Sequence, residues 1–464
     1  MYTFRQSLQS QATVLVALAL LTARGGAAQG PVFATLYSFK GGSDGSGPNG
    51  VTFGKNGSLY GSTYSGGTNT CGINVAYLCG TVFELAPATG GGWTKTVLYS
   101  FNGADGAVPS PNPVGAPGAS LAFGSNGTLY GTTETGGSND SSGNGAVGGT
   151  VFELAPPATA GGLWTETVLY SFSNSFGAPH TPLGGVLVGP SGAVYGTTFS
   201  NEYPAGQYEA GGTVFALIPP SAPGGAWTKH ILVSLWPPTA MGNNPIAGVI
   251  SAGGSLYGTT NITGTAGCGT VFEVSPPAAA GGAWTGTAIY DFDNGGGCQS
   301  VAPVAVAPGG VLYGTTFNGG SGTLCVVGCG TVFQLTPPAA AGGAWTEAVI
   351  YSFTGLNGDG ASPAAGVVLG KNGVLYGTTT HGGSATSGCH DPYTGANGCG
   401  TVFQLTPPVT PGGAWTETIL HSFTGQNGEG SIPGPLTASR IGVLYGPTWT
   451  GGTAGKGTIF AIQP

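Results

Sequence analysis

Short runs of β-branched and aromatic residues recur along the chain, and clusters of glycine, proline and asparagine separate them. One copy of the pattern contains four such runs, at residues 366–369, 374–379, 400–405 and 415–423. The residues of the runs favour strands, and the clusters favour turns. Asn372-Gly373, between the first two runs, is a strong signal for a tight hairpin. Each copy therefore predicts four antiparallel strands.

The pattern occurs seven times. A Tyr-Gly step marks each copy, at Tyr60, Tyr130, Tyr195, Tyr257, Tyr313, Tyr376 and Tyr445. A Gly-Thr-[Val/Ile]-Phe step follows in every copy, and a Trp-Thr step with a Leu-Tyr-Ser-Phe-like segment follows in six. Four strands repeated without intervening helices are typical of a β-propeller. We expect an all-β, seven-bladed propeller with repeat units of approximately 40–101, 102–172, 173–235, 236–292, 293–353, 354–423 and 424–464.

The two ends of the chain complement each other. The last copy stops after its third predicted strand, whereas residues 32–39 (VFATLYSF) resemble a fourth strand without a blade. We expect residues 31–39 to complete the seventh blade, so that residues 29–464 form a single closed domain. An open solenoid or a split into two sheets is the alternative.

Residues 1–28 have the features of a secretory signal peptide, with Arg5 before an apolar segment at 12–23 and small residues at 26–28. The apolar run of about 12 residues is shorter than the about 20 that a membrane-spanning helix needs. We therefore expect a protein that is secreted or displayed at the cell surface, with no membrane span in the mature chain.

The composition limits the classes of partner that the protein can bind. Only nine residues are lysine or arginine, and the net charge is −8. A nucleic-acid-binding protein needs a basic surface to neutralise phosphates, so we expect no nucleic-acid partner. We expect a monomer.

Eight cysteines in an exported chain indicate disulfides. Four of them directly precede the third strand of a copy, and three others lie in the same loops. We expect the pairs Cys71–Cys79, Cys325–Cys329 and Cys389–Cys399, which leave Cys268–Cys298. The alternative is a zinc site, because His381 and His390 lie near Cys389, but the spacing fits no common zinc pattern.

Most acidic residues occupy repeated positions. Three follow the Trp-Thr step, at Glu166, Glu347 and Glu417, and we expect them to be solvated strand positions. Four others lie in the connections between blades, at Asp44, Asp105, Asp359 and Glu429. Here a carboxylate that accepts hydrogen bonds from nearby backbone N–H groups stabilises a turn. A calcium site is the alternative, although calcium usually requires more carboxylates than one per loop.

The non-repetitive residues gather in the loops between second and third strands, which emerge on one face of a propeller. Variable loops on a rigid scaffold commonly bind ligands. Tyr203, Tyr208, His390 and Tyr393 are the candidate ligand-binding residues, because each combines apolar area with a polar tip. No nucleophile motif, histidine pair for a metal or phosphate-binding loop stands out, so we expect no catalytic residue, metal or cofactor. The first strands are expected to line the central channel.

The motifs Leu-Tyr-Gly-Thr-Thr, Gly-Thr-Val-Phe-Glu-Leu and Leu-Tyr-Ser-Phe followed by Asp-Gly resemble the GloVer tandem-repeat family. Its members are exported bacterial proteins with varied surface anchors. The resemblance covers residues 32–464 and implies export and a repeat architecture. It implies no activity and no catalytic residues.

The sequence favours a non-enzymatic scaffold that binds an extracellular glycan or protein. The alternative is a propeller enzyme, a hydrolase or lyase acting on extracellular polysaccharide, with Glu202, Glu209, His390 or Asp391 on the loop face. Such an enzyme would need two of these groups to converge on one substrate atom.

Overall fold

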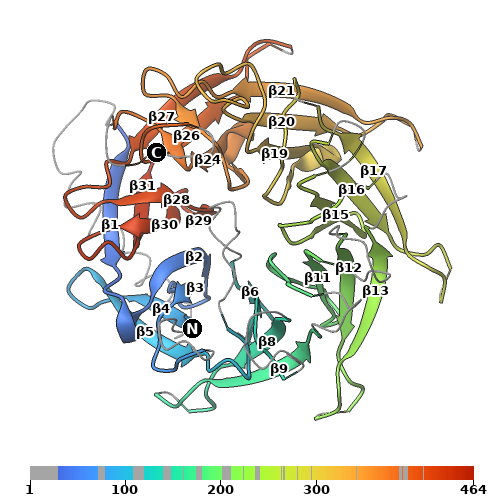
Figure 1. Ribbon diagram of the computed structural model, residues 1–464, viewed down its shortest axis with the longest axis vertical. Helices are drawn as coiled ribbons and strands as arrows, with labels where there is room; N and C mark the ends of the chain where they lie inside the picture. Colours follow the sequence, from blue (N-terminus) through green and yellow to red (C-terminus); the bar gives the residue numbers. More distant parts are fainter. Residues whose placement is uncertain are drawn as a thin grey trace, which may run out of the picture.

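The computed structural model describes residues 30–464, apart from 72–78, 108–119, 139–147, 160, 174–179, 201–210, 223, 236–240, 263, 265–266, 280, 294, 341, 386–388, 390–394 and 411. Seven antiparallel blades surround a central axis, and the described residues contain no α-helix (Figure 1). The predicted seven-bladed propeller is therefore confirmed. In each blade the first strand lies nearest the axis and the fourth lies outermost.

The strands of the first four blades have the following bounds. Blade 1 contains β2 (Ser46–Phe53), β3 (Leu59–Ser65), β4 (Thr81–Pro87) and β5 (Trp93–Ser100). Blade 2 contains β6 (Ala122–Phe123), β7 (Leu129–Thr133), β8 (Thr150–Ala155) and β9 (Thr165–Ser171). Blade 3 contains β10 (Leu187–Val188), β11 (Val194–Thr198), β12 (Thr213–Ile218) and β13 (Thr228–Ser234). Blade 4 contains β14 (Ile250–Ala252), β15 (Ser255–Thr259), β16 (Thr270–Ser275) and β17 (Thr285–Asp291).

The remaining blades follow the same order. Blade 5 contains β18 (Ala305–Val306), β19 (Leu312–Thr316), β20 (Thr331–Thr336) and β21 (Thr346–Ser352). Blade 6 contains β23 (Val368–Leu369), β24 (Leu375–Thr379), β26 (Thr401–Thr406) and β27 (Thr416–Ser422). Blade 7 contains β28 (Gly430–Pro433), β29 (Thr437–Ala438), β30 (Leu444–Gly451), β31 (Thr458–Gln463) and β1 (Val32–Ser38). Outside the blades, β22 (Gly360–Ala361) pairs with β25 (His381–Gly382), and short 3-10 turns occupy Gly42–Asp44, Pro308–Gly310 and Lys371–Gly373.

The N-terminal strand closes the ring, as the sequence predicts. Strand β1 is the outermost strand of blade 7 and pairs antiparallel with β31, from Val32 opposite Gln463 to Ser38 opposite Thr458. Directly after β1, Phe39 is fully buried and packs edge-on against Phe83 of blade 1. The two ends of the chain thus share one blade, and β1 covers the edge that β31 would otherwise expose.

The repeated Tyr-Gly step has a steric cause. At Gly196, an added Cβ would lie 2.6 Å from the ring of Phe215, the phenylalanine of the Gly-Thr-Val-Phe step in the neighbouring strand. The same contact recurs at 2.8 Å between Gly61 and Phe83. A side chain at this position would collide with the buried phenylalanine ring, so only glycine fits.

Phenylalanine pairs join the blades. The phenylalanine that ends each Leu-Tyr-Ser-Phe segment is fully buried and meets, edge to face, the phenylalanine of the next blade's third strand. Phe353 and Phe403 are one such pair, with ring centroids 5.1 Å apart. The other five pairs are Phe39–Phe83, Phe101–Phe152, Phe172–Phe215, Phe292–Phe333 and Phe423–Phe460. Between blades 3 and 4 the buried Leu235 takes this position.

Each threonine of the repeated Thr-Thr step has its own hydrogen-bond partner. The second threonine bonds the threonine that opens the third strand, as Thr316 does with Thr331 at 2.8 Å. The first threonine reaches the next blade, where the Thr315 hydroxyl donates to the carbonyl of Ala365 at 3.0 Å. Strand β23 contains only Val368–Leu369 rather than the predicted residues 366–369.

The Asn-Gly hairpin has one more residue than the tightest type. Gly370 N–H donates to the carbonyl of Val374 at 2.7 Å, which leaves a three-residue loop. Asn372 and Gly373 both have positive φ, at 57° and 78°. This backbone region suits these two residue types, so the turn position is as predicted.

Candidate functional site

One end of the ring carries the loops between second and third strands together with the connections between blades, and we call it the long-loop rim. All four disulfides lie there, as Cys71–Cys79, Cys268–Cys298, Cys325–Cys329 and Cys389–Cys399. These are the expected pairs, and no cysteine is left for a zinc site. Four disulfides are typical of an oxidising, extracellular environment.

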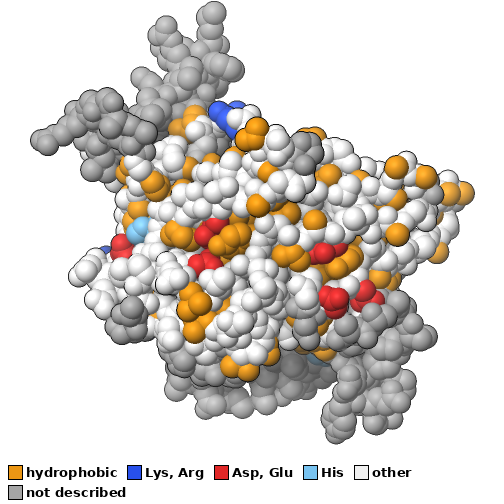
Figure 2. Space-filling view, turned by 90° about the horizontal axis from the view of Figure 1, so that it is seen from above, with side chains coloured by type: hydrophobic (Ala, Val, Ile, Leu, Met, Phe, Trp, Pro, Cys, Tyr) orange, Lys and Arg blue, Asp and Glu red, His pale blue; other side chains and the backbone are white. Residues whose placement is uncertain are grey.

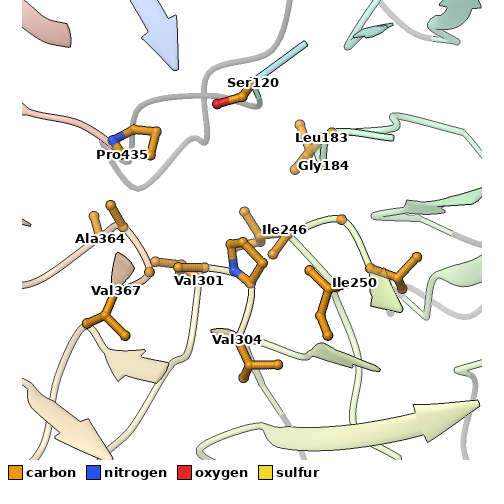
Figure 3. A pocket seen from close by; sticks show the side chains of 18 of the residues that line it. Ser120, Leu183, Gly184, Ile246, Ile250, Val301, Val304, Ala364, Val367 and Pro435 are labelled. Atoms are coloured by element: carbon orange, nitrogen blue, oxygen red, sulfur yellow. The ribbon is translucent and has the colours of Figure 1, made fainter. Parts of the chain in front are cut away.

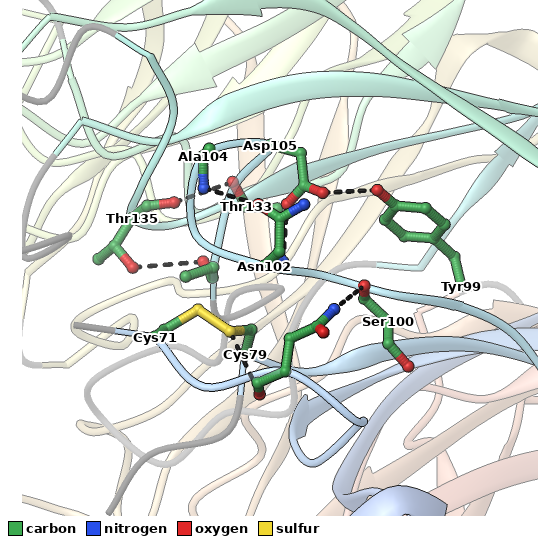
Figure 4. Close-up of a disulfide and its surroundings, with 11 residues drawn as sticks. Cys71, Cys79, Tyr99, Ser100, Asn102, Ala104, Asp105, Thr133 and Thr135 are labelled. Atoms are coloured by element: carbon green, nitrogen blue, oxygen red, sulfur yellow. Dashed lines mark hydrogen bonds between the residues drawn. A yellow bond between two sulfur atoms is a disulfide. The ribbon is translucent and has the colours of Figure 1, made fainter. Parts of the chain in front are cut away.

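The disulfides lie against the blade connections. In Figure 4 the Cys71–Cys79 disulfide lies below residues 102–105, the connection that leaves blade 1. A Cβ added to Gly103 in that connection would lie 3.4 Å from the Cys71 sulfur. Each crosslink therefore supports a loop and a connection at the same place on the rim.

The predicted ligand-binding residues lie outside the described part of the chain. Tyr203 and Tyr208 belong to residues 201–210, and His390 and Tyr393 belong to residues 390–394. Glu202, Glu209 and Asp391 of the enzyme alternative fall in the same segments, and the expected signal peptide precedes residue 30. These assignments remain predictions.

An exposed apolar surface on this rim was missed by the sequence reasoning. The Cys325–Cys329 disulfide presents Val326 and Val327, which are 81% and 51% exposed. Leu324, which precedes Cys325, is 41% exposed, and a Cβ on Gly355 would lie 3.1 Å from it. Leu356 follows Gly355 and is 46% exposed, and we call Leu324, Val326, Val327 and Leu356 the valine patch. A Cβ on Gly395, which follows the segment containing His390 and Tyr393, would lie 3.9 Å from Val326. The available signal was the short sequence Cys-Val-Val-Gly-Cys.

A cavity of about 310 Å³ lies in the central channel (Figure 3). Its lining comes from the inner segments of six blades and includes Leu183, Ile246, Val301, Ala364 and Pro435. These segments lead into the first strands of their blades. The inner part of each of these six blades therefore lines the channel, as expected for the first strands. The lining side chains are aliphatic apart from the Ser120 hydroxyl, and they offer an apolar surface rather than groups that transfer protons.

The acids of the blade connections stabilise turns, as expected. Asp105 accepts a hydrogen bond from the backbone N–H of Asn102 at 2.9 Å and another from the Tyr99 hydroxyl at 2.5 Å (Figure 4). Asp359 accepts from both the backbone N–H and the hydroxyl of Thr354, each at 2.6 Å. No group of three or more metal-binding side chains occurs among the described residues.

The prediction for Glu166, Glu347 and Glu417 was wrong. These side chains are partly buried, and each has one buried carboxylate oxygen with no hydrogen-bond partner among the described residues. Burial, and then the negative charges of Asp105 and Glu153, raise the pKa of Glu166 to about 8. Burial and Asp359 raise the pKa of Glu417 to about 7. The outer strand turns these residues toward the preceding blade, and they are therefore not solvated.

Acidic side chains accordingly occur in small separate groups. Figure 2 views the ring from its edge and shows red groups set among apolar side chains, with few basic side chains in sight. Within the described residues, no helix is long and apolar enough to cross a membrane.

Comparisons with solved structures return proteins of low similarity. A putative oxidoreductase (glucose dehydrogenase) from Thermus thermophilus is 12% identical with a TM-score of 0.41, over 94% of this chain and 100% of that chain. The gluconolactonase XC5397 from Xanthomonas campestris is 13% identical with a TM-score of 0.38, over 96% and 92%. Pseudomonas fluorescens PhoX, in complex with vanadate, is 11% identical with a TM-score of 0.41, over 94% and 95%. At these values no activity is transferred to this chain.

No curated protein matches the sequence significantly. The sequence profile of the Gloeobacter/Verrucomicrobia repeat matches residues 116–390, which is more than half of the 464 residues. The matched segment runs from the inner segment of blade 2 into the loops of blade 6. The chain therefore belongs to the Gloeobacter/Verrucomicrobia repeat family.

Proposed function

We propose that this protein is a secreted, non-enzymatic scaffold that binds an extracellular glycan or protein on its long-loop rim. The observation that carries the proposal is the valine patch. Val326 is 81% exposed and, with its neighbours, forms an apolar surface. Binding of a partner would remove this surface from water, which is favourable. The patch adjoins Gly395, whose added Cβ would lie 3.9 Å from Val326.

The disulfides support this use of the rim. A loop closed by Cys325–Cys329 is restricted before any partner arrives, so its binding loses little further conformational entropy. The exposed residues Leu163 and Val409, in contrast, lie singly on the hairpins of the opposite rim. Isolated exposed apolar residues of that kind are ordinary on protein surfaces.

Export and monomeric state are part of the proposal. The signal-peptide features of residues 1–28 and the four disulfides support secretion into an oxidising compartment. The closed ring supports a monomer, because β1 of the same chain supplies the strand that blade 7 would otherwise lack.

The test uses the purified mature protein in a glycan array and in a cell-surface binding assay. A separate assay measures polysaccharide hydrolysis by the same protein. Val326→Ser/Val327→Ser and alanine variants of Tyr203, Tyr208, His390 and Tyr393 should weaken binding. The matched control, Leu163→Ser/Val409→Ser on the opposite rim, should bind normally. Loss of binding only in the control would place the site on the other face. Release of reducing ends or unsaturated sugars would replace the scaffold with the enzyme alternative.

A further inference from the structure

At each boundary between two blades, one position of an outer strand faces the preceding blade. This junction position directly follows the Trp-Thr step and pairs across the sheet with the residue two places after the third-strand phenylalanine, as Lys95 does with Leu85 and Glu417 with Leu405. By the same register Phe33 holds the position in β1, opposite Ile462. The seven occupants are Phe33, Lys95, Glu166, Lys229, Gly286, Glu347 and Glu417.

Where the occupant is a lysine, its ammonium group either pairs with a carboxylate or lies over an aromatic ring. Lys95 Nζ lies 3.1 Å from the Asp44 carboxylate, which also accepts a hydrogen bond from the Tyr37 hydroxyl at 2.8 Å. Lys229 Nζ lies 4.8 Å from the centre of the Tyr170 ring. A cation is favourable over such a ring.

Where the occupant is glutamate, the same surroundings hold two carboxyls. Between blades 5 and 6 the Tyr351 hydroxyl donates to Glu417 Oε2 at 3.0 Å. Glu417 Oε1 and Asp359 Oδ1 are both buried and lack any other hydrogen-bond partner in the described structure. Burial first, then the charge of Asp359, and last a hydrogen bond between the two carboxyls raise the pKa of Glu417. Two acceptor-only carboxylates cannot make that bond, whereas one retained proton satisfies both oxygens.

The other two glutamate junctions have related surroundings. Glu166 faces Tyr99 and Asp105 of the preceding blade and connection, and Glu153 of its own blade. Glu347 accepts a hydrogen bond from Tyr290 and faces Asp293, and burial raises the pKa of Glu347. No lysine, arginine or histidine contributes to the electrostatics of these three glutamates in the described structure.

We propose that the glutamates of these three junctions remain protonated in the folded ring, with the proton of Glu417 shared with Asp359, so that the propeller is held together at mildly acidic pH and loosened by alkali. The physical reason is that two carboxylates facing each other away from water repel each other. At the junction of blades 7 and 1, Lys95 gives the same neutrality with a fixed charge instead of a proton.

The sign of the pH dependence follows from linkage. A glutamate in the unfolded chain has a pKa of about 4.3, and the folded values for Glu417 and Glu166 are about 7 and about 8. The folded state therefore binds more protons between these values, and stability falls as pH rises through them. The contribution is complete below about pH 4.3 and lost above about pH 8. Each retained proton changes the folding equilibrium by at most about tenfold per pH unit, less where solvent reaches the carboxyl.

The test compares urea unfolding midpoints of the mature, oxidised protein at about pH 5.5 and about pH 8.5, the window in which these glutamates titrate. The wild-type midpoint should fall between the two values. In Glu166→Gln/Glu417→Gln the fall should be smaller, because glutamine retains the hydrogen-bonding shape and cannot lose a proton. The matched control, Glu84→Gln/Glu273→Gln, changes third-strand glutamates that accept hydrogen bonds from Tyr60 and Tyr257. It should follow the wild type.

A second variant covers the case in which the glutamine variant folds poorly. Glu417→Lys should pair with Asp359 as Lys95 pairs with Asp44, and should unfold at a higher urea concentration than wild type at about pH 8.5, above the folded pKa of Glu417. An unchanged pH dependence in both variants would overturn the proposal. So would added calcium that removes the alkaline loss in wild type but not in Glu417→Gln, because a metal rather than a proton would then join the carboxyls.

Discussion

The edge-to-face phenylalanine pairs between blades provide the most quantitative test of the packing. Phe353 ends the Leu-Tyr-Ser-Phe-like segment of blade 5 and is fully buried. Its ring meets Phe403 of blade 6 at 5.1 Å with an interplanar angle of 62°. Phe353→Ala would remove the ring from the blade boundary and leave a cavity between two sheets.

The expected cost follows from burial and from the ring geometry. Truncating a fully buried phenylalanine to alanine costs about 3–5 kcal/mol. Phe353→Leu should be milder, because Leu235 occupies the same position between blades 3 and 4 and is also fully buried. That variant should lose mainly the edge-to-face contribution, about 0.5–1.5 kcal/mol, together with a small packing defect.

Urea unfolding followed by tryptophan fluorescence measures both variants against wild type. Val409→Ala is the control, since Val409 is 102% exposed on a hairpin tip and its truncation should change the free energy of unfolding by less than about 0.5 kcal/mol. The expected order of stability is wild type and Val409→Ala, then Phe353→Leu, then Phe353→Ala. If Phe353→Ala unfolds at the same urea concentration as Val409→Ala, the phenylalanine pairs do not hold the blades together.

Two further predictions concern closure and the Tyr-Gly step. Deleting residues 32–39 should lower thermal stability and cause aggregation, because β31 becomes an unpaired edge; a truncated protein that melts like the mature one would contradict this. Gly196→Ala should destabilise by about 1–3 kcal/mol, since its Cβ would lie 2.6 Å from the Phe215 ring. Gly295→Ala, where the nearest contact is 3.4 Å, should be neutral in the same denaturation assay, and equal effects at both sites would refute the steric argument.

The blades, their closure and the disulfides could be predicted because their signals recur in phase. The spacing of Tyr60, Phe83 and Trp93 repeats with the strand order, and residues 32–39 match the one strand that the last copy lacks. The disulfide pairs could be predicted for the same reason, since Cys79 and Cys399 hold the same place in their copies.

The junction glutamates could not be predicted in the same way. Strand alternation shows that Glu417 and Thr416 point to opposite sides of their sheet. It does not show which of the two sides is covered, because each side of a blade faces a neighbouring blade. Which side is covered depends on the connection carrying Asp359, which lies far away in sequence. The valine patch was missed because a disulfide loop that encloses only three residues gives no repeat signal.

The central claim is that the N-terminal strand closes the ring in a defined register, and a crosslink tests it most directly. Ala34 lies opposite Ala461 in the β1–β31 pair. Residues opposite each other in antiparallel strands have Cα atoms about 4.5–5.5 Å apart, within the range that a disulfide spans. Peptide mapping of oxidised Ala34→Cys/Ala461→Cys should therefore find the two peptides joined within one chain. Thr35→Cys/Ala461→Cys, shifted by one residue onto the other face, should remain uncrosslinked; equal crosslinking in both variants, or none in either, would contradict the closed ring in this register.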